Sequence, residues 1–314
     1  MKRRLAGWLI ASSVLPQLVM TTPALAITAS DRIVIITSGE ASPYQDAVNG
    51  ITQHLNEAAP ELTVDVFITS GDQVDLKRAV ETATSNDASL IVVLGSKALK
   101  ACEGLPLDQP ILGALVLDER NLAAMPNATG IVLRHPPAVQ FDLLKRLIPD
   151  VRRVGILYNP KLNATTVEAA RNAAEAAGLV LDAVAVESPR EIPNALNRLS
   201  RRVDVLWGIP DAMVMSAATA RNILLTSLRN RVPLVGPASA WTKAGALYSI
   251  EWNYNDIGLQ TGEMALALID GTSMVATAPV SPRAVSYSVN LKTATHCNLS
   301  ISDPVIAGAV SVFQ

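Results

Sequence analysis

The sequence contains few of the residues on which catalysis and metal binding depend. Its 314 residues include two cysteines, three histidines and 4% aromatic residues. The cysteines and histidines show no metal-ligand spacing, and the signatures G-x-G-x-x-G, G-x-x-x-x-G-K-[ST] and G-x-S-x-G are absent. The sequence therefore favours a protein that is not an enzyme and uses no metal or other cofactor.

An excess of basic residues is also missing. Lys and Arg number 26 against 28 Asp and Glu, a formal charge of -2, and residues 27–314 alone carry -5. Nucleic-acid binding needs a basic surface, so no nucleic-acid partner is expected. A repressor would also need an N-terminal helix-turn-helix, and a different kind of segment occupies that place.

That N-terminal segment has the pattern of a secretory signal. Three basic residues at positions 2–4 precede the apolar run LAGWLIASSVLPQLVM, and small residues end the segment at Ala26. The pattern predicts a signal peptide, residues 1–26, cleaved after Ala26. An uncleaved membrane anchor is the alternative, which Pro16 within the run disfavours. No cysteine follows the cleavage site and no later run could span a bilayer, so we expect a soluble, exported, periplasmic protein.

Cys102 and Cys297 would both enter an oxidising compartment. One disulfide between them is an open alternative, because sequence spacing alone does not show contact.

Short apolar runs alternate with helical patterns along most of the remaining chain. RIVIIT at 32–37 is followed by a segment in which Ala47, Ile51 and Leu55 share one helical face, and the unit recurs around LIVVL, VGILY and VDVLW. Continuous apolar strands alternating with helices are typical of parallel sheets covered on both faces. A Pro-containing crossover at 135–137 separates two sets of units. We therefore expect an α/β fold of two doubly wound, Rossmann-like lobes.

Polar and small residues follow most of the predicted strands. Ligands of open parallel sheets bind beyond the carboxyl ends of the strands, where helices begin. Two lobes facing each other would bring these loops into one cleft. The predicted ligand-binding residues are Ser38, Glu40, Tyr44, Ser96, Asp118, Tyr158, Asn159, Asn163, Asp211, Ala238, Trp241 and Glu251.

Three stretches taken in order resemble a known family. They are VGILYNPKLNATTVEAARNAAEAAGL, VDVLWGIPDAMV and KAGALYSIEWNYNDIGLQTGEMALALIDG. The sequence resembles the ABC-transporter substrate-binding proteins that include the tryptophan and aromatic amino-acid binding proteins. The resemblance implies a type I periplasmic binding protein fold, a small molecule enclosed between two lobes by hinge closure, and delivery to a membrane permease.

The crossover at 135–137 and the resemblance together predict how the chain divides. The first lobe is expected at 27–134 plus about 243–277, the second at 135–242, and a C-terminal segment, 278–314, recrosses a hinge of several crossovers. The helix after Asn255 should return to the first lobe. We expect a monomer whose partners are its ligand and an ABC permease of the inner membrane.

Three candidate residues match family positions. Asn159 matches a Tyr-Asn-Pro strand end, Asp118 ends a first-lobe strand, and Asp211 matches a Pro-Thr-Asp whose middle residue is missing here. Each has a simpler alternative, since Asn159 can cap a helix and Asp211 can cap the helix predicted after it. If capping is its task, Asp211→Asn should leave the free energy of unfolding nearly unchanged.

The chain departs from the family at two places. PASA at 237–240 replaces a carboxylate-rich segment, and Glu251 lies where the family has Tyr-Gly-Val-Asp. An amino-acid ligand needs an anion for its ammonium group and donors for its carboxylate, because burying either charge unpaired is costly. The candidate anions are Glu40, Asp211 and Glu251; the candidate donors are Ser38, Ser96 and helix N-termini.

Tyr44, Trp241 and Trp252 could form a stacking wall for a planar ligand, with core packing as the alternative. The predicted ligand is therefore an amino acid or a planar aromatic compound. The second candidate function is a periplasmic ligand sensor that presents its closed form to a membrane receptor or an outer-membrane uptake system.

Overall fold

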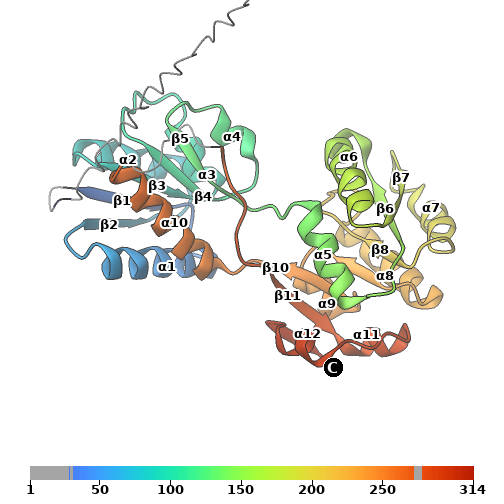
Figure 1. Cartoon of the computed structure of the whole chain (residues 1–314). Helices are drawn as coiled ribbons and strands as arrows, with labels where there is room; N and C mark the ends of the chain where they lie inside the picture. The colour runs from blue at the N-terminus through green and yellow to red at the C-terminus, as the bar shows by residue number, and fades with distance from the viewer. Residues whose placement is uncertain (1–27, 29–30, 272–277) are drawn as a thin grey trace, which may run out of the picture.

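The computed structural model describes residue 28, residues 31–271 and residues 278–314. Two α/β lobes lie side by side and are joined by thin connecting segments (Figure 1). The predicted signal peptide and its cleavage site fall outside the described residues. Within the described part of the chain, no helix combines the length and the apolar character needed to cross a bilayer.

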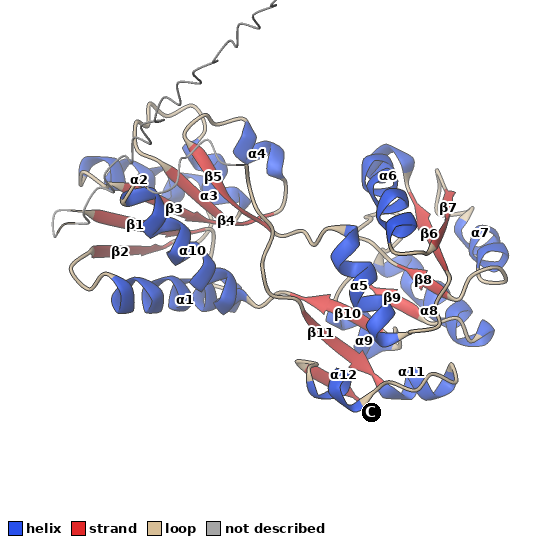
Figure 2. Ribbon diagram, in the orientation of Figure 1, coloured by secondary structure: helices blue, strands red, loops and turns tan. Residues whose placement is uncertain are grey.

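The first lobe is a five-stranded parallel sheet with helices on both faces (Figure 2). Residues of β1 alternate between two apolar clusters: Val34 and Ile36 pack with α2, α3 and α4, and Ile33 and Ile35 pack with α1 and α10. The strand order is β2-β1-β3-β4-β5. The strands are β1 (Arg32–Thr37), β2 (Thr63–Ile68), β3 (Leu90–Leu94), β4 (Ile111–Val116) and β5 (Ala128–Val132). The helices are α1 (Ser42–Ala58), α2 (Gln73–Ser85), α3 (Ser96–Cys102), α4 (Glu119–Ala123) and α10 (Tyr254–Ile269).

The second lobe is a seven-stranded sheet in the order β12-β11-β10-β9-β8-β6-β7. All neighbouring strands are parallel except β10 and β11, which are antiparallel. The strands are β6 (Arg153–Tyr158), β7 (Val180–Ala185), β8 (Val205–Trp207), β9 (Leu234–Gly236), β10 (Tyr248–Glu251), β11 (Ser286–Asn290) and β12 (Ser311–Phe313). The helices are α5 (Pro137–Leu147), α6 (Pro160–Ala176), α7 (Ile192–Leu199), α8 (Ala217–Asn230), α9 (Ser239–Ala244), α11 (Leu291–His296) and α12 (Asp303–Ala307).

Three chain crossovers join the lobes. The first runs from β5 to α5, the second is Trp252–Asn253 between β10 and α10, and the third leads to β11. The return to the first lobe begins at Tyr254 rather than near residue 243, because residues 248–251 form a strand of the second sheet. The C-terminal segment is still in the first lobe at Val280, which pairs with Ile131, and then enters the second sheet as β11.

The helix that returns, α10, packs closely on α1. A Cβ atom added at Gly50 would lie 2.1 Å from the Asn255 carbonyl oxygen, and one added at Gly258 would lie 2.2 Å from that of Ala47. Only glycine fits such a backbone approach, because any side chain would overlap the facing main chain. The two glycines therefore fix α10 to the first lobe.

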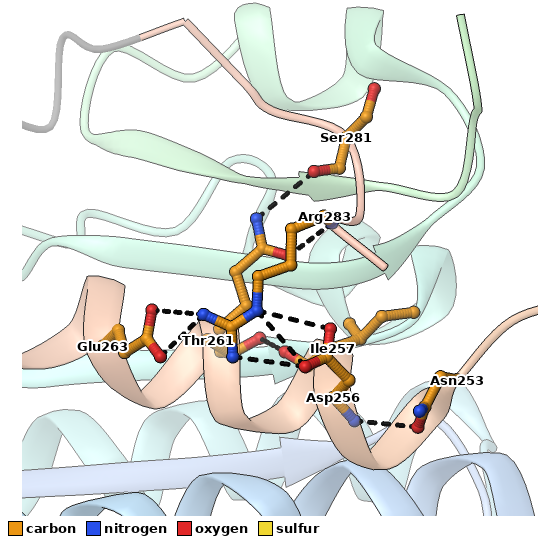
Figure 3. A network of polar contacts seen from close by, with 8 residues as sticks. Asn253, Asp256, Ile257, Thr261, Glu263, Ser281 and Arg283 are labelled. Atoms are coloured by element: carbon orange, nitrogen blue, oxygen red, sulfur yellow. Dashed lines mark hydrogen bonds and ion pairs between the residues drawn. The ribbon is translucent and has the colours of Figure 1, made fainter. Parts of the chain in front are cut away.

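Polar contacts fasten the third crossover to the same helix (Figure 3). Arg283 donates to both oxygens of Glu263 at 2.7 Å and to Asp256 at 3.2 Å. The Gln260 side chain donates to the Ser281 carbonyl oxygen and accepts from the Arg283 backbone N–H. The crossover is thus held to α10 as far as Arg283, three residues before β11 begins.

The two cysteines lie in different lobes. Cys102 ends α3 of the first lobe and Cys297 follows α11 of the second, and both are buried free thiols. Burial raises the pKa of Cys102 to about 12. The disulfide considered from the sequence is therefore not formed.

Candidate ligand-binding site

The carboxyl ends of both sets of parallel strands face the crossovers. The first crossover leaves the end of β5 and enters the start of α5, and the second leaves the end of β10 and enters the start of α10. Each crossover thus joins the strand-end edge of one lobe to that of the other (Figure 1). The residues predicted for the ligand site lie on these two edges, at the last residue of a strand, just beyond it, or in the first turn of the following helix. The strands are β1, β3, β4, β6, β8, β9 and β10.

The first lobe has a hollow of about 180 Å³ at its strand-end edge. Its lining residues are Thr37, Gly39, Tyr44, Gln45, Val48, Asn49 and Ile68. Tyr44 is the one predicted ligand residue among them. The sequence does not identify Gln45 and Asn49 as ligand residues. Its apolar pattern marks only the face of α1 that carries Ala47, Ile51 and Leu55, and these two amides lie one turn apart on another face. The hollow combines amide and hydroxyl groups with apolar side chains.

Two predicted serines of this lobe hold neighbouring loops. The Ser38 hydroxyl accepts from the Ala98 backbone N–H at 2.8 Å, and the Ser96 hydroxyl accepts from the Leu117 backbone N–H at 3.1 Å. These bonds connect the ends of β1, β3 and β4. Each hydroxyl keeps a proton that it can donate.

The two predicted carboxylates of the first lobe differ in environment. Asp118 caps α4 and pairs with Arg120 at 2.6 Å, and the hydrogen bonds from Arg120 lower its pKa to about 2. Glu40 is exposed, and within the described residues no donor reaches its carboxylate. Asp118 is therefore already neutralised by a neighbour, whereas Glu40 is not.

Apolar side chains are exposed at both strand-end edges. Ile68 is 58% exposed at the end of β2, and Leu117 is 72% exposed after β4. In the second lobe, Leu162 in the first turn of α6 is 61% exposed. Solvent-exposed leucines on facing edges supply apolar area that a bound molecule or lobe closure could bury.

Asp211 joins two loops of the second lobe. Its side chain is 4% exposed. One oxygen accepts from the Asn159 backbone N–H at 2.8 Å and from the Asn163 side chain at 2.9 Å; the other accepts from the backbone N–H groups of Met213 and Val214 at 3.0 and 2.9 Å. Burial raises the pKa of Asp211, but these four bonds outweigh burial and hold it below the usual value.

Asp211 therefore accepts hydrogen bonds both from the start of α6 and from the loop that follows Asp211 itself. Asn159 in turn caps α6 through a bond from the Lys161 backbone N–H at 3.0 Å, and Asn163 is buried. The predicted trio therefore forms one internally bonded unit at the ends of β6 and β8. A contact between Asp211 and a ligand stays a prediction. The Asp211 carboxylate already accepts four hydrogen bonds from the protein.

Glu251 is positioned by a network of hydroxyl groups. Its Oε1 accepts from Ser249 at 3.0 Å and from Ser288 at 2.8 Å, and Thr242 donates to Ser249 at 2.7 Å. Among the described residues, no donor reaches Oε2. The Glu251 carboxylate is therefore oriented at the end of β10 while one oxygen is left available.

Two aromatic residues follow β10 in the chain, Trp252 and Tyr254. Burial raises the pKa of Tyr254, and the Glu251 carboxylate raises it further. Tyr44 of α1, Trp252 and Tyr254 pack against the same apolar cluster of the first lobe.

The other aromatic candidates have structural partners. Trp252 stacks on His135, with ring centroids 4.4 Å apart and planes at 18°, so the stack joins the first and second crossovers. His135 is 5% exposed, and no hydrogen-bond partner for its Nε2 lies among the residues that the structure describes. Burial lowers its pKa to about 4. Trp241 packs against an apolar cluster of the second lobe, as Met213 and Met215 do.

The remaining two predicted residues, Tyr158 and Ala238, lie at strand ends of the second lobe. Tyr158 is half-buried, and its carbonyl oxygen accepts from the Val186 backbone N–H. Ala238 precedes α9 and is exposed, without a side chain that can cap.

Comparison with known proteins bears on this arrangement. A family model described as ABC transporter substrate binding protein matches residues 32–313. A tyrosine-binding protein of Clostridioides difficile (strain R20291) is 21% identical over 222 residues, which span 68% of this chain and 64% of that relative.

Two solved structures share the fold. One is a domain from Streptococcus pneumonia in complex with L-Trp, 24% identical, with a TM-score of 0.56 over 90% of this chain and 99% of the other. The other is a ligand-free, open substrate-binding protein from Clostridium difficile, 20% identical, with a TM-score of 0.73 over the same shares. The predicted fold, two doubly wound lobes of the type I periplasmic binding protein class, is confirmed. With almost all of its described residues inside the family model, this chain belongs to the ABC transporter substrate-binding protein family.

Proposed function

We propose that this chain is an exported protein that binds a small molecule between its two lobes and delivers it to an ABC permease in the inner membrane. The observation that carries the proposal is that the crossovers join the two strand-end edges. One edge has a hollow of about 180 Å³, and the other presents the oriented carboxylate of Glu251. A molecule held there would touch both lobes, so its contacts would favour closure of the hinge.

The side chains at the two edges favour an amphipathic ligand. Ile68, Leu117 and Leu162 supply apolar surface, and the hollow adds the amides of Gln45 and Asn49. The available oxygen of Glu251 suits an ammonium group, since charge-assisted hydrogen bonds are short and strong. An amino acid with a large apolar or aromatic side chain has both features. Relatives whose names mention tyrosine or L-Trp add support for this class.

A thermal-shift screen of residues 27–314 tests the proposal. The panel contains the natural L-amino acids, their amine-free analogues and small aromatic acids. A true ligand at 100 times its dissociation constant should add about 2.7 kcal/mol to the free energy of unfolding. Scattering profiles should contract on addition of that ligand. A panel without a single stabilising compound would contradict the proposed ligand class.

Substitution of Glu251 tests separately whether this carboxylate binds the ammonium group of the ligand. Glu251→Gln keeps the shape and removes the charge, so binding should weaken by roughly ten-fold to a hundred-fold for the amino acid. The amine-free analogue should bind both proteins alike. Glu168→Gln is the matched control, because Glu168 is an exposed carboxylate on α6. Unchanged calorimetric affinity of Glu251→Gln would show that the ammonium anchor lies elsewhere.

A further inference from the structure

Formal charge is divided unequally between the lobes. The first lobe, residues 31–134 and 254–283, contains eight basic and seventeen acidic residues, a charge of -9. The second lobe, residues 137–251 and 284–314, contains fifteen basic and eleven acidic residues, a charge of +4. The small net charge of the whole protein therefore conceals two regions of opposite sign.

Most basic residues of the second lobe gather at one side of its sheet. This side, which we name the basic edge, lies at the amino ends of the parallel strands and the carboxyl ends of the helices between them. It faces away from the crossovers, because the crossovers meet the strand-end edge. Its eleven basic residues are all exposed: Lys145, Arg146, Arg152, Arg153, Arg198, Arg201, Arg202, Arg229, Arg231, Lys243 and Lys292.

Acidic residues do not balance this group. Five belong to the same region, Asp142, Asp150, Glu175, Asp182 and Asp204, which leaves a formal charge of +6. The rest of the second lobe carries -2. The Asp204 carboxylate is occupied by the backbone N–H groups of Arg152 and Arg153, at 2.8 Å each. Within the described residues, ion pairs reach only two side chains of the basic edge, Arg146 and Arg202.

Helix ends explain part of the pattern. Basic residues in a last helical turn interact favourably with the helix dipole, and Lys145, Arg198 and Arg229 occupy such positions. The same reason does not apply to residues in the loops before β6 and β8, such as Arg152 and Arg201. The first lobe has the same helix and strand polarity but an excess of acidic residues, so the fold itself does not require a basic edge.

The exposed residues of the basic edge indicate what kind of partner fits. The hollow described above lies in the other lobe, and the small apolar cavity of about 20 Å³ in the second lobe lies inside its core. Specific protein interfaces have an apolar or aromatic centre, whereas Val180 is the large exposed apolar residue at the amino ends of these strands. Eleven exposed positive groups with little exposed apolar surface among them match a dense array of single negative charges.

We propose that the basic edge of the second lobe docks on anionic phospholipid head groups. Anionic membrane surfaces attract basic protein segments, and the attraction decays within a Debye length, about 8 Å at physiological salt. The acidic first lobe is repelled by the same surface, so the protein is oriented with its second lobe toward the membrane. The strand-end edges then stay in solution, and ligand can exchange while the protein is docked.

Vesicle sedimentation tests the proposal with residues 27–314 of the protein. The probes are vesicles of equal parts phosphatidylglycerol and phosphatidylcholine, and vesicles of phosphatidylcholine alone. The protein should sediment with the anionic vesicles at low salt, remain in solution with the neutral ones, and dissociate as salt is raised. Because the whole protein carries a net negative charge, sedimentation with anionic vesicles would have to come from a local basic surface. Absence of sedimentation at low salt overturns the proposal.

Two matched variants locate the surface. Arg198→Glu/Arg201→Glu/Arg229→Glu changes the basic edge, and Lys161→Glu/Arg190→Glu/Arg221→Glu changes exposed residues elsewhere on the lobe by the same charge. Since each basic group near an anionic surface contributes roughly a factor of five, the first variant should lose more than ten-fold in affinity and the second much less. Circular dichroism melts confirm that both fold, and a corresponding triple Gln variant replaces the first if it does not.

Two results would refute the assignment. Equal loss in the two variants would mean that net charge alone governs binding. The second result is self-association of the protein in sedimentation velocity without vesicles. If that association weakened with salt and were lost only in the basic-edge variant, the partner of the basic edge would be the acidic lobe of a second copy.

Discussion

Asp211→Asn is expected to destabilise the protein, although the sequence alone predicts almost no change. As a helix cap, Asn is about as good as Asp. The structure reverses this expectation, because Asp211 accepts four hydrogen bonds with two oxygens while 4% exposed. An amide has one oxygen and one NH₂ group, so it cannot accept from both pairs of donors.

The magnitude follows from which donors lose their acceptor. If the new amide oxygen faces Met213 and Val214, the NH₂ group faces Asn159 and Asn163. The Asn163 side chain can turn over and accept, but the Asn159 backbone N–H cannot. A buried donor without a partner costs about 1–3 kcal/mol, and the remaining bonds lose their charge. The free energy of unfolding should therefore fall by about 2–4 kcal/mol, which lowers the melting temperature by roughly 5–10 °C.

Calorimetric melting of the parent and two variants measures this difference. Asp118→Asn is the control, since Asp118 caps α4 and pairs with the exposed Arg120, and its loss should cost less than about 1 kcal/mol. Because the folded-state pKa of Asp211 is lowered, its stabilisation is complete above the unfolded-state pKa. It is lost as the pH falls through the folded-state pKa, which lies below the usual value for an aspartate. Melting of Asp211→Asn within about 0.5 kcal/mol of the parent would refute the reasoning.

Two further predictions concern the hinge region and can be checked by the same melts. Gly258→Ala should lower the free energy of unfolding by about 1–3 kcal/mol or more, because the added methyl group would lie 2.2 Å from the Ala47 carbonyl oxygen. A variant as stable as the parent would mean that α10 can move away from α1. His135 has a folded-state pKa near 4 against about 6.5 when unfolded, so the unfolded state binds the extra proton and stability should fall as pH drops from 6.5 to 4, by at most about 3 kcal/mol. His135→Phe keeps a ring against Trp252 and should remove that pH dependence, and an unchanged slope would assign it to other groups.

Much of the fold follows from apolar periodicity. The apolar runs RIVIIT, LIVVL, VGILY and VDVLW, each predicted to be a strand followed by a helix, correspond to β1, β3, β6 and β8. The sequence did not identify β10, β11 and β12 as members of the second sheet. β11, the partner that joins β12 to this sheet, pairs antiparallel with β10 from about forty residues later, and no local pattern specifies that pairing. The late return to the first lobe at Tyr254 has the same cause.

The site was predictable in position but not in the state of each group. Strand polarity places Ser38, Asn159 and Glu251 on facing edges, and this needs only the order of strands and helices. Whether a carboxylate is available depends on neighbours distant in sequence. Asp211 meets Asn159 52 residues away, and Glu251 meets Ser288 37 residues away. Gln45 and Asn49 show the reverse, since exposed amides on a helix give no sequence signal until a hollow is seen beside them.

The bonding of the two edges suggests how the lobes would share recognition under the proposed function. In the second lobe, Asp211, Asn159 and Asn163 satisfy one another, so that edge keeps its shape whether or not a ligand is present. Its exception is Glu251, which keeps one oxygen available while serines fix the other. The first lobe instead has a hollow lined by amides and a phenol. A ligand would therefore enter the first lobe and meet Glu251 on closure, so Glu251→Gln should weaken the closed complex while initial association with the first lobe persists.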